Sequence, residues 1–455
     1  MYTHSPKKQK SLFRNITDYL KSKGVYDSSK YVKLANQIDW DTLCTPLEKA
    51  YCLNNGRPGI EVRVMLALEM LKHMMKGISD QVLVNKLQSD LEIQYFCGFV
   101  STEQKTQMDP SLLSQFRTRL SKFPEILQEI QNVHLIETIK KIPKKRQGEY
   151  DQDSTVIHES IKYPHDIDLL NDLIQKWAKL LNICKKAGWK QFQDLVAGGK
   201  RLANKLYLKY NFSSGKGKLD FDKTKKQLLN FAKKMETTLE EWFSKFRHIS
   251  RDTSKEFSQT KNKIKEFITL SKEVISQQSE LMKKKAKGVK QSVKNRIISL
   301  SKTHVRPIVK GKKWVKVQFG GKAHIWQIWG KIAVFAWLSR ENKHDSEYIQ
   351  DWVEIVEKAI GKPPDELGYD KWWRSQEVYE RLEKKWIKNR IQWSPDWNKL
   401  TKKERKRCYD RRAFNEAVIN DVKNNRGVNN NKYSKNNTEW SIMMGCMASN
   451  YIRVR

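Results

Sequence analysis

The sequence contains no apolar stretch long enough to cross a lipid bilayer. A membrane-spanning helix requires an apolar run of at least about 18 residues, and the 455-residue chain has none. The N-terminal residues are basic, but no apolar segment follows them as it would in a secretory signal. We therefore expect a soluble protein without a membrane partner, located in the cytoplasm.

Cysteine is scarce, and its spacing argues against the common zinc sites. The six cysteines form no Cys-x2-Cys pair and no Cys/His cluster with zinc-ligand spacing. His158, His165 and His324 show no metal spacing either. The cysteines are expected to be reduced thiols that pack as small apolar groups, as in an intracellular protein.

Acidic residues are few in comparison with basic ones. The chain has 88 Lys and Arg against 51 Asp and Glu, which gives a formal net charge of +37 spread over the whole sequence. Such an excess predicts a polyanionic partner, and nucleic acid is the commonest one. An anionic membrane surface is the competing partner. Composition alone indicates polyanion binding and no specific activity.

Residues 1–125 are predicted to form a helical N-terminal domain. Apolar residues recur at helical spacing over 59–77, and Ser79 is placed to cap the next helix. A third helix carries Arg117 and Arg119 on its polar side. Short helices with basic faces fit a helix-turn-helix-like domain in which these two arginines contact DNA. A helical bundle with solvated charges explains the same pattern equally well.

The middle of the chain alternates between strand-like and helical patterns. A basic linker is predicted at 126–150, and a β-branched strand at 154–157 belongs to a core segment at 151–165. Residues 166–300 are predicted to be helical, and 225–285 almost lack glycine and proline. The apolar stripe there would pack long paired helices, either as a core or as a seam between two copies of the chain.

Residues 301–455 are predicted to begin with strands and to end in helices. Turns at 311–313 and 320–321 would separate the strands of an antiparallel meander. The other expected elements are a helix at 345–360, a short strand at 366–370, a helix beginning near 402 and a polar loop at 424–437.

Four residues near the C-terminus have the spacing of a helix face. Tyr409, Arg412, Glu416 and Lys423 follow one another at intervals of 3, 4 and 7 residues. Each interval is close to a whole number of α-helical turns, so the four side chains can share one face. That face would combine a possible metal-binding carboxylate with cations that hold phosphates. A solvated face with an Arg–Glu pair is the simpler interpretation of the spacing alone.

Two aspartates upstream could complete a metal site with Glu416. Asp153 lies at the start of the predicted strand at 154–157, and Asp370 ends the short strand at 366–370. Three acids at strand ends and on a helix can bind two divalent ions ~3.5–4 Å apart, as in enzymes that cleave phosphodiesters. All-oxygen ligands suit Mg²⁺ or Mn²⁺ rather than zinc.

At these positions the sequence resembles the bacterial DDE transposases of insertion sequences, which have an RNase H-like catalytic core. Residues 409–423 fit the family signature Tyr-x2-Arg-x3-Glu-x6-Lys without a gap. One departure is Gln318, where the family often has glutamate, at a position that is not catalytic. The other similar blocks are 56–99, 109–120, Asp-Ser-Thr within 153–173, 305–322, Gly-Tyr-Asp within 368–378, and 438–453.

The resemblance implies a role for each motif residue. Asp153, Asp370 and Glu416 would be the catalytic metal ligands for two Mg²⁺ or Mn²⁺ ions. Lys423 would contact DNA at the transposon end, and Arg412 and Tyr409 would support the helix and its phosphate contacts. The family hydrolyses a phosphodiester at the transposon end and transfers the released 3′-hydroxyl to target DNA.

The predicted fold is α+β, with an RNase H-like mixed sheet flanked by helices. The helical N-terminal domain precedes it, 166–300 form a long helical insertion, and 301–455 complete the core. Expected partners are double-stranded DNA, as terminal inverted repeats and target, and a second copy in a homodimer. Because the expected partner is DNA, we expect the protein to be associated with the bacterial nucleoid. The alternatives are an inactive or regulatory DNA-binding relative, and an RNase H-like nuclease without strand transfer.

Other aspartates are alternative candidates for the roles given to Asp153 and Asp370. Asp151 precedes the same strand as Asp153, but the family block aligns on Asp-Ser-Thr. Asp365 follows two prolines and has the setting of a turn residue. Asp166 and Asp168 are better explained as caps of the helix that follows them.

Overall fold

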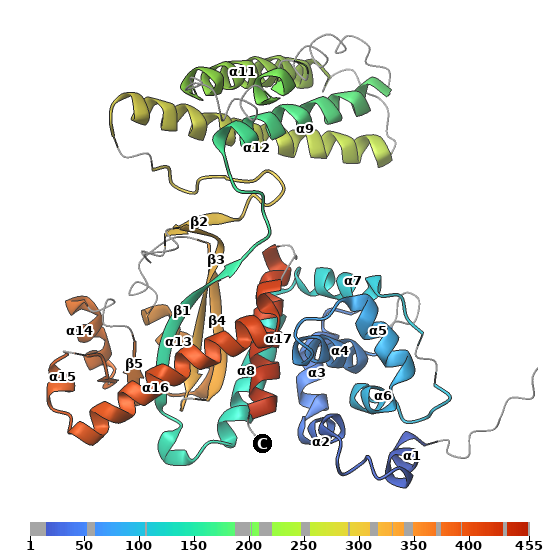
Figure 1. Cartoon of the computed structure of the whole chain (residues 1–455), viewed down its shortest axis with the longest axis vertical. Helices are drawn as coiled ribbons and strands as arrows, with labels where there is room; N and C mark the ends of the chain where they lie inside the picture. Colours follow the sequence, from blue (N-terminus) through green and yellow to red (C-terminus); the bar gives the residue numbers. More distant parts are fainter. Residues whose placement is uncertain are drawn as a thin grey trace, which may run out of the picture. The chain divides into compact units, whose positions relative to one another are not determined.

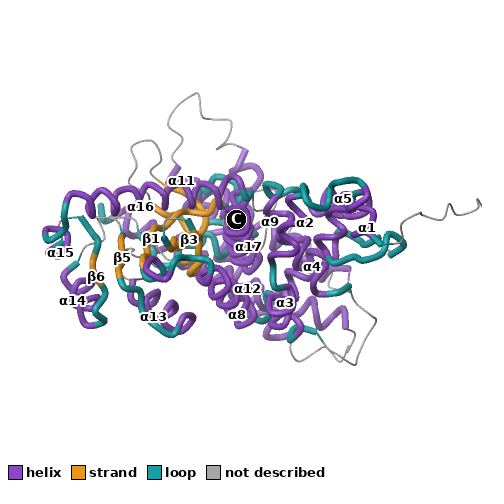
Figure 2. Tube along the Cα trace, turned by 90° about the horizontal axis from the view of Figure 1, so that it is seen from below, coloured by secondary structure: helices purple, strands orange, loops and turns teal. Residues whose placement is uncertain are grey.

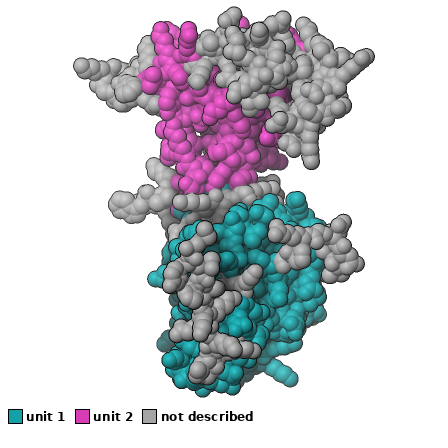
Figure 3. Space-filling model, turned by 90° about the vertical axis from the view of Figure 1, so that its right-hand side faces the viewer, with its two compact units in different colours: residues 1–159, 320–455 teal, residues 160–319 magenta. Residues whose placement is uncertain are grey.

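The computed structural model divides the chain into two compact units. Unit 1 comprises Met1–Glu159 and Gly320–Arg455, and unit 2 comprises Ser160–Phe319 (Figure 3). The residues that the structure describes are 15–51, 60–104, 107–186, 201, 203–208, 221–246, 255–289, 292–309, 317–329, 331–340, 349–369, 375–392, 394–430 and 435–453.

The N-terminal part of unit 1 is helical, as predicted. Ser79 caps α5 through its Oγ, which accepts a hydrogen bond from the backbone N–H of Val82 (3.3 Å). The helix predicted over 59–77 is α4. The helices are α1 (Ile16–Ser22), α2 (Lys30–Gln37), α3 (Trp40–Glu48), α4 (Val62–Met74), α5 (Asp80–Ser89), α6 (Leu91–Cys97) and α7 (Ser111–Leu120).

A helix occupies much of the segment predicted as a linker. α8 runs from Pro124 to Lys140 and buries Ile126, Ile130 and His134, which follow one another at intervals of four residues, about one helical turn. The 3₁₀ turn η1 (Lys144–Arg146) then leads into the first strand. The linker is therefore shorter than predicted, whereas the proposed domain boundary near residue 125 stays a prediction.

A mixed sheet forms the centre of unit 1, and with the surrounding helices it confirms the α+β class. Its strand order is β2-β3-β1-β5-β6, and β4 also pairs with β3. β1 and β4 are antiparallel to β3, whereas β5 is parallel to β1 and to β6. The strands are β1 (Glu149–His158), β2 (Arg306–Val309), β3 (Val317–Ile328), β4 (Ile332–Ser339), β5 (Glu366–Gly368) and β6 (Lys388–Asn389).

The turn predicted at 320–321 is wrong, because β3 continues through both glycines. Gly320 and Gly321 pair with His158 and Ile157 of β1. A Cβ atom on Gly320 would lie 1.9 Å from the carbonyl oxygen of Ile157. The glycine is therefore needed for close strand approach rather than for a reversal of the chain. The turn predicted at 311–313 lies outside the described residues.

Helices cover both faces of the sheet. α13 (Ile349–Ile360) lies on one face and α16 (Lys402–Asn420) on the other (Figure 2). The predicted polar loop at 424–437 is only partly a loop, because helical turns and the start of α17 occupy much of it. The remaining elements are α14 (Gln376–Lys384), α15 (Pro395–Asn398), the π-helical η5 (Asp421–Asn425), η6 (Val428–Asn430) and α17 (Lys435–Arg453).

The N-terminal helices and the sheet share one hydrophobic core. This core joins α4 and α7 to β3, β4 and α17 (Figure 1). Trp440 of α17 stacks edge-on against Phe116 of α7, with ring centroids 5.8 Å apart. Its indole N–H also donates to Glu69 of α4 (2.9 Å). The N-terminal helices are therefore packed into unit 1 rather than attached to its surface.

Unit 2 is built from long paired helices, as the sequence predicts. They are α9 (Asp166–Lys186), α11 (Phe221–Phe246) and α12 (Lys255–Ala286). The apolar stripe, including Leu228, Met235 and Phe267, is buried within the unit. It therefore forms a core within the chain, and the homodimer stays a prediction. No helix in the described part of the chain has the length and apolar character needed to cross a membrane.

Two buried histidines should make unit 1 less stable in acid. His73 contacts the backbone carbonyl of Arg426 (2.8 Å), and His134 lies 3.0 Å from the side-chain amide of Asn450. Burial lowers the pKa of His73 to about 4 and that of His134 to about 3. Unfolded histidines titrate near pH ~6.5, so the unfolded state binds more protons below that pH. Stability should therefore fall as the pH drops from about 6.5 towards 4.

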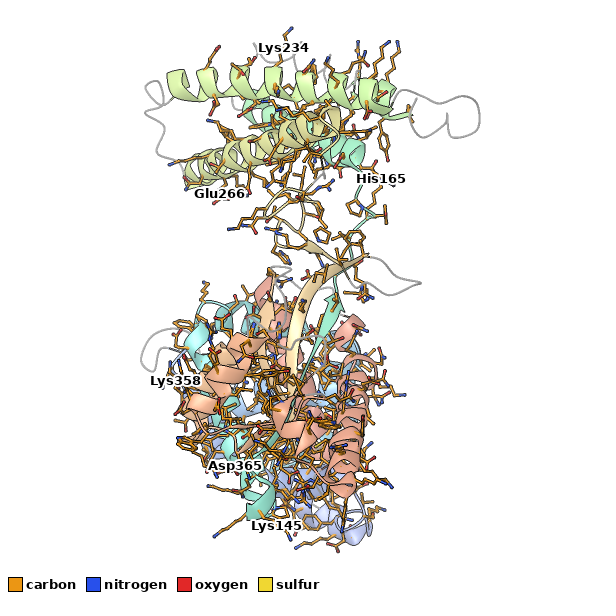
Figure 4. The ribbon with its side chains drawn as sticks, turned by 90° about the vertical axis from the view of Figure 1, so that its left-hand side faces the viewer. Lys145, His165, Lys234, Glu266, Lys358 and Asp365 are labelled. Atoms are coloured by element: carbon orange, nitrogen blue, oxygen red, sulfur yellow. The ribbon has the colours of Figure 1, made fainter. Side chains whose placement is uncertain are left out.

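Denaturant unfolding at pH 7 and pH 5 tests this linkage. Each buried histidine should cost roughly 2 kcal/mol of unfolding free energy between these pH values. His134→Gln should reduce the pH dependence by that amount. The matched control is His165→Gln, at an exposed histidine (Figure 4), and it should leave the dependence unchanged. An unaltered pH dependence in His134→Gln would contradict the assignment.

Candidate active site

Strand β1 carries Asp153 into a pocket next to α16. Alternate residues of a strand share a face, so Asp151 and Asp153 point to the same side of the sheet. Asp153 is half-buried, and its Oδ1 accepts a hydrogen bond from the backbone N–H of Ser154 (2.7 Å). The pocket is lined by Asp153 of β1, Tyr369 after β5, and Tyr409 and Arg412 of α16. Two motifs far apart in the sequence therefore meet in one place.

Helix α16 presents its signature residues along one edge of its buried face. Its N-terminus is fixed by a capping box between Thr401 and Glu404. The buried face includes Arg411, Asn415 and Val418. Tyr409 is half exposed and packs edge-on against Trp397, with ring centroids 5.4 Å apart. Arg412 is half-buried, and Glu416 lies exposed one turn further along the helix.

Lys423 reaches the same strand from a different kind of helix. α16 ends at Asn420, and Lys423 lies in the π-helical η5 that follows. Its Nζ donates a hydrogen bond to Oγ1 of Thr155 (3.1 Å), two residues beyond Asp153 on β1. The prediction of one continuous α-helical face for all four signature residues is therefore wrong. The wider turn of a π-helix changes the phase of the helix, and such turns are frequent at functional sites.

A buried ionic cluster joins α16 to β1 and β5. The guanidinium of Arg411 donates to both carboxylate oxygens of Asp151 (2.7 and 3.0 Å) and also to Glu366. These three side chains are at most 9% exposed. Around them, Arg407 pairs with Glu149 (2.6 Å) and Arg390 pairs with Glu366 (2.7 Å). We call these six residues the ionic cluster.

The ionic cluster leaves no room for a larger residue at Gly368. A Cβ atom there would lie 2.0 Å from Oδ1 of Asp151. Burial raises the pKa of Asp151, and Arg411 opposes that rise. Burial alone would raise the pKa of Glu366, but Arg411, Arg390 and Arg407 together lower it. Asp151 is therefore engaged by Arg411 in holding α16 against the sheet. Both Asp151 and Asp153 line the pocket, and Asp153 is the one that lies outside the ionic cluster.

Asp365 cannot replace Asp370, because it lies at the wrong end of the sheet. Its backbone N–H donates to the carbonyl oxygen of Gly148 (3.0 Å), before β1 begins, and it lies near Lys145 in Figure 4. Asp153 is five residues further along, on the order of 16 Å at ~3.3 Å per residue. Asp370 itself lies outside the described residues. Within the described ranges, no three Asp, Glu, His or Cys side chains are grouped to hold a metal ion.

The two arginines of α7 do not lie on one basic face. Arg117 is 3% exposed and forms ion pairs with Glu69 (2.5 Å) and Asp80. Its predicted position on the polar side of the helix is therefore wrong, because the buried Glu69 and the half-buried Asp80 hold it inside unit 1. Arg119 is exposed and stacks over the ring of Tyr51 at 4.3 Å. Arg119 alone remains available as a predicted DNA contact.

Sequence reasoning missed Arg411, although the sequence contained a signal for it. Arg411, Asn415 and Val418 follow one another at intervals of four and three residues, which places the arginine on the apolar side of its helix. A buried arginine requires acidic partners. The partners themselves could not be identified, since Asp151 lies 260 residues away in the chain.

Comparison with known proteins links the N-terminal half of unit 1 to DNA transposition. Residues 20–119 match the model of a family described as Transposase domain (DUF772). This match supports a transposase. It covers α2 to α7 and stops before β1, so it does not reach the pocket around Asp153. The transposase assignment therefore stands in general form, and the catalytic site is not part of the matched region.

A relative and a search of solved structures add little about mechanism. The chain is 27% identical over 195 residues to "Uncharacterized protein ORF8 in nfe locus" of Rhizobium meliloti. That similarity covers 42% of this chain and 88% of the relative, whose name states no activity. No solved structure matches. The reaction that the chain catalyses must therefore be inferred from its own residues.

Proposed function

We propose that the protein is a DDE-type transposase that cleaves DNA at the ends of an insertion sequence and joins them to target DNA. One observation carries the proposal. Asp153 of β1 shares a pocket with Tyr409 and Arg412 of α16, and Lys423 is bonded to Thr155 on the same strand. The sequence motifs that carry these residues are independent of each other. Their meeting is what a shared catalytic role requires.

The sheet supports an RNase H-like core for this proposal. β1 lies inside the sheet, between the antiparallel β3 and the parallel β5. Asp151 pairs with Gly368 across β1 and β5. Asp153 follows Asp151 by two residues, and Asp370 follows Gly368 by two residues in the sequence. Parallel strands advance together, so this equal spacing favours Asp370 as the second acid.

The donor set suits a hard divalent cation. Asp153, Glu416 and Asp370 would offer carboxylate oxygens, the ligands that Mg²⁺ and Mn²⁺ prefer. A bound metal pair would activate a water or sugar hydroxyl and stabilise the leaving oxygen. The cationic side chains of Arg412 and Lys423, placed on either side of Glu416 in the sequence, would hold the phosphates of the DNA. Tyr409, packed on Trp397, would keep the start of this helix face in place.

Cleavage of terminal-repeat DNA by the purified chain tests the proposal. The substrate is a duplex that carries the inverted repeats flanking the gene, and the control duplex has scrambled ends. We expect Mg²⁺-dependent release of a 3′-hydroxyl at the repeat and its joining to a second duplex. Both reactions should stop on chelation and return with Mg²⁺ or Mn²⁺.

The same assay separates the alternative functions. A nuclease would cut scrambled ends equally well and join nothing. A regulatory DNA-binding relative would bind the repeats but would not cut them, whichever divalent metal ion is added. Either result would refute the transposase mechanism proposed for this site.

A further inference from the structure

A second cavity in unit 1 has the chemistry of a nucleotide-binding site. Its volume is about 500 Å³, within the range of small-molecule sites in proteins. Lys30 and Lys33 of α2 and Arg426 after η5 contribute positive charge to its wall. No acidic side chain is among the described residues that line it. An anionic ligand would therefore meet no acidic side chain on the wall, although Arg426 is also paired with Asp421.

The rest of the wall is aromatic and apolar. Tyr31 and Leu34 of α2, Met74 of α4 and Ile452 of α17 line the cavity beside the cations. Tyr31 is half-buried, and the ammonium group of Lys30 lies over its ring at 4.8 Å. Aromatic rings offer a surface on which a base can stack. The cavity thus combines a phosphate-binding part with a part that suits a sugar or a base.

Arg426 contributes charge to this cavity from a position that is mostly buried. One terminal nitrogen of its guanidinium donates to Asp421 (3.1 Å), and the side chain is 13% exposed. Its Nε is fully buried, so a ligand in the cavity cannot reach that atom. The contribution of Arg426 to an anionic ligand is therefore mainly electrostatic, and the exposed Lys30 and Lys33 would make the direct contacts.

The chain connects this cavity directly to the candidate active site. Lys423, which bonds to Thr155 of β1, and Arg426, which lines the cavity, are three residues apart. The Cα atoms of two residues three apart are separated by at most about 11 Å, and the two long side chains add to the distance between their contact points. A DNA strand advances by roughly 3.4 Å per nucleotide. A strand that contacts Lys423 could therefore reach the cavity within several nucleotides.

We propose that this cavity binds one nucleotide of the DNA strand that leaves the active site. The phosphate is held by Lys30, Lys33 and Arg426, and the sugar and base lie against Tyr31. This inference rests on the proposed function, since it requires DNA at the site around Asp153. It assigns to α2 a DNA contact that the sequence did not predict.

The salt dependence of DNA binding tests the inference. Full-length protein and a labelled terminal-repeat duplex are titrated at several salt concentrations in the presence of a chelator, so that no cleavage occurs. In the double variant Lys30→Gln, Lys33→Gln, the slope of log affinity against log salt should become shallower by about 1, because the one phosphate that both lysines contact is no longer neutralised. The matched control is Lys21→Gln, Lys23→Gln, which removes the same charge from exposed lysines of the α1 region. The control should keep the wild-type slope.

Acetylation of wild-type protein provides a second, mutation-free measurement. Bound duplex should protect Lys30 and Lys33 from an amine-acetylating reagent and leave Lys21 and Lys23 reactive. Equal slopes in the two double variants, or no protection of Lys30 and Lys33 in a complex that does form, would overturn the inference. If that complex still cleaves terminal repeats, the proposed function survives and only the cavity assignment fails. Absence of any complex with the duplex would overturn both.

Discussion

Replacing Asp153 with asparagine should abolish DNA cleavage and leave DNA binding intact. Asparagine keeps the size of the side chain but removes the charge that a divalent cation needs. Loss of a residue that only orients a metal ligand costs roughly 10–100-fold in activity or affinity, so loss of a ligand itself should cost more. Glu416→Gln should have an effect of the same size, because both residues would hold the same metal pair.

The measurement compares single-turnover cleavage of the terminal-repeat duplex with its binding. The matched control is Asp410→Asn, which neutralises an exposed acid on the same helix as Glu416. This control should retain wild-type cleavage. DNA affinity should hold or rise slightly in all three variants, because each loses a negative charge near phosphate. Wild-type cleavage in Asp153→Asn would remove the basis of the proposed mechanism.

Replacing Arg411 with methionine should be the most destabilising single change on α16. The variant leaves Asp151 without its bidentate partner and weakens the pairing of Glu366, both of which are buried. Breaking a buried ion pair by removing one partner costs about 3–5 kcal/mol. Denaturant unfolding of the full chain measures the change. Lys406→Met, at an exposed position of the same helix, should stay within about 0.5 kcal/mol of wild type.

A second variant separates charge burial from loss of packing. In Asp151→Leu, Arg411→Met both partners become apolar, and such replacements are often neutral for stability. This double variant should therefore recover part of the stability lost in Arg411→Met. A double variant that is less stable than the single one by the full cost of Asp151→Leu would show that the two residues act independently. The ionic cluster would then not be the link between α16 and β1.

Local patterns in the sequence predicted the helices and strands themselves better than the surfaces against which they pack. Hydrophobic periodicity located α4, α11 and α12, because the residues that define each helix are neighbours in the chain. The same periodicity could not show that the stripe of α11 and α12 packs within unit 2. Gly320 was misread for a related reason, since a glycine has the same signature in a turn and at a close strand contact.

The candidate site was predictable only in part, because local spacing identifies a helix but not its contacts with distant residues. The signature spacing identified the helix that carries Tyr409, Arg412 and Glu416, but not the π-helical turn that holds Lys423. The Asp-Ser-Thr block favours Asp153 over Asp151, although the two lie on the same face of one strand and both line the pocket. What the sequence could not show is that the distant Arg411 engages Asp151 in the ionic cluster. The position of Asp370 in the site stays a prediction.

The shared core of unit 1 limits how this protein can be dissected. Trp440, near the end of the chain, fills a space between Phe116 and Glu69, and it does so from a helix that also packs on β4. An excised N-terminal fragment would present that space to water, and the remainder would expose the apolar face of α17. Exchange of the N-terminal helices between related chains would thus demand a matching C-terminal helix, so the two ends of the sequence are expected to change together.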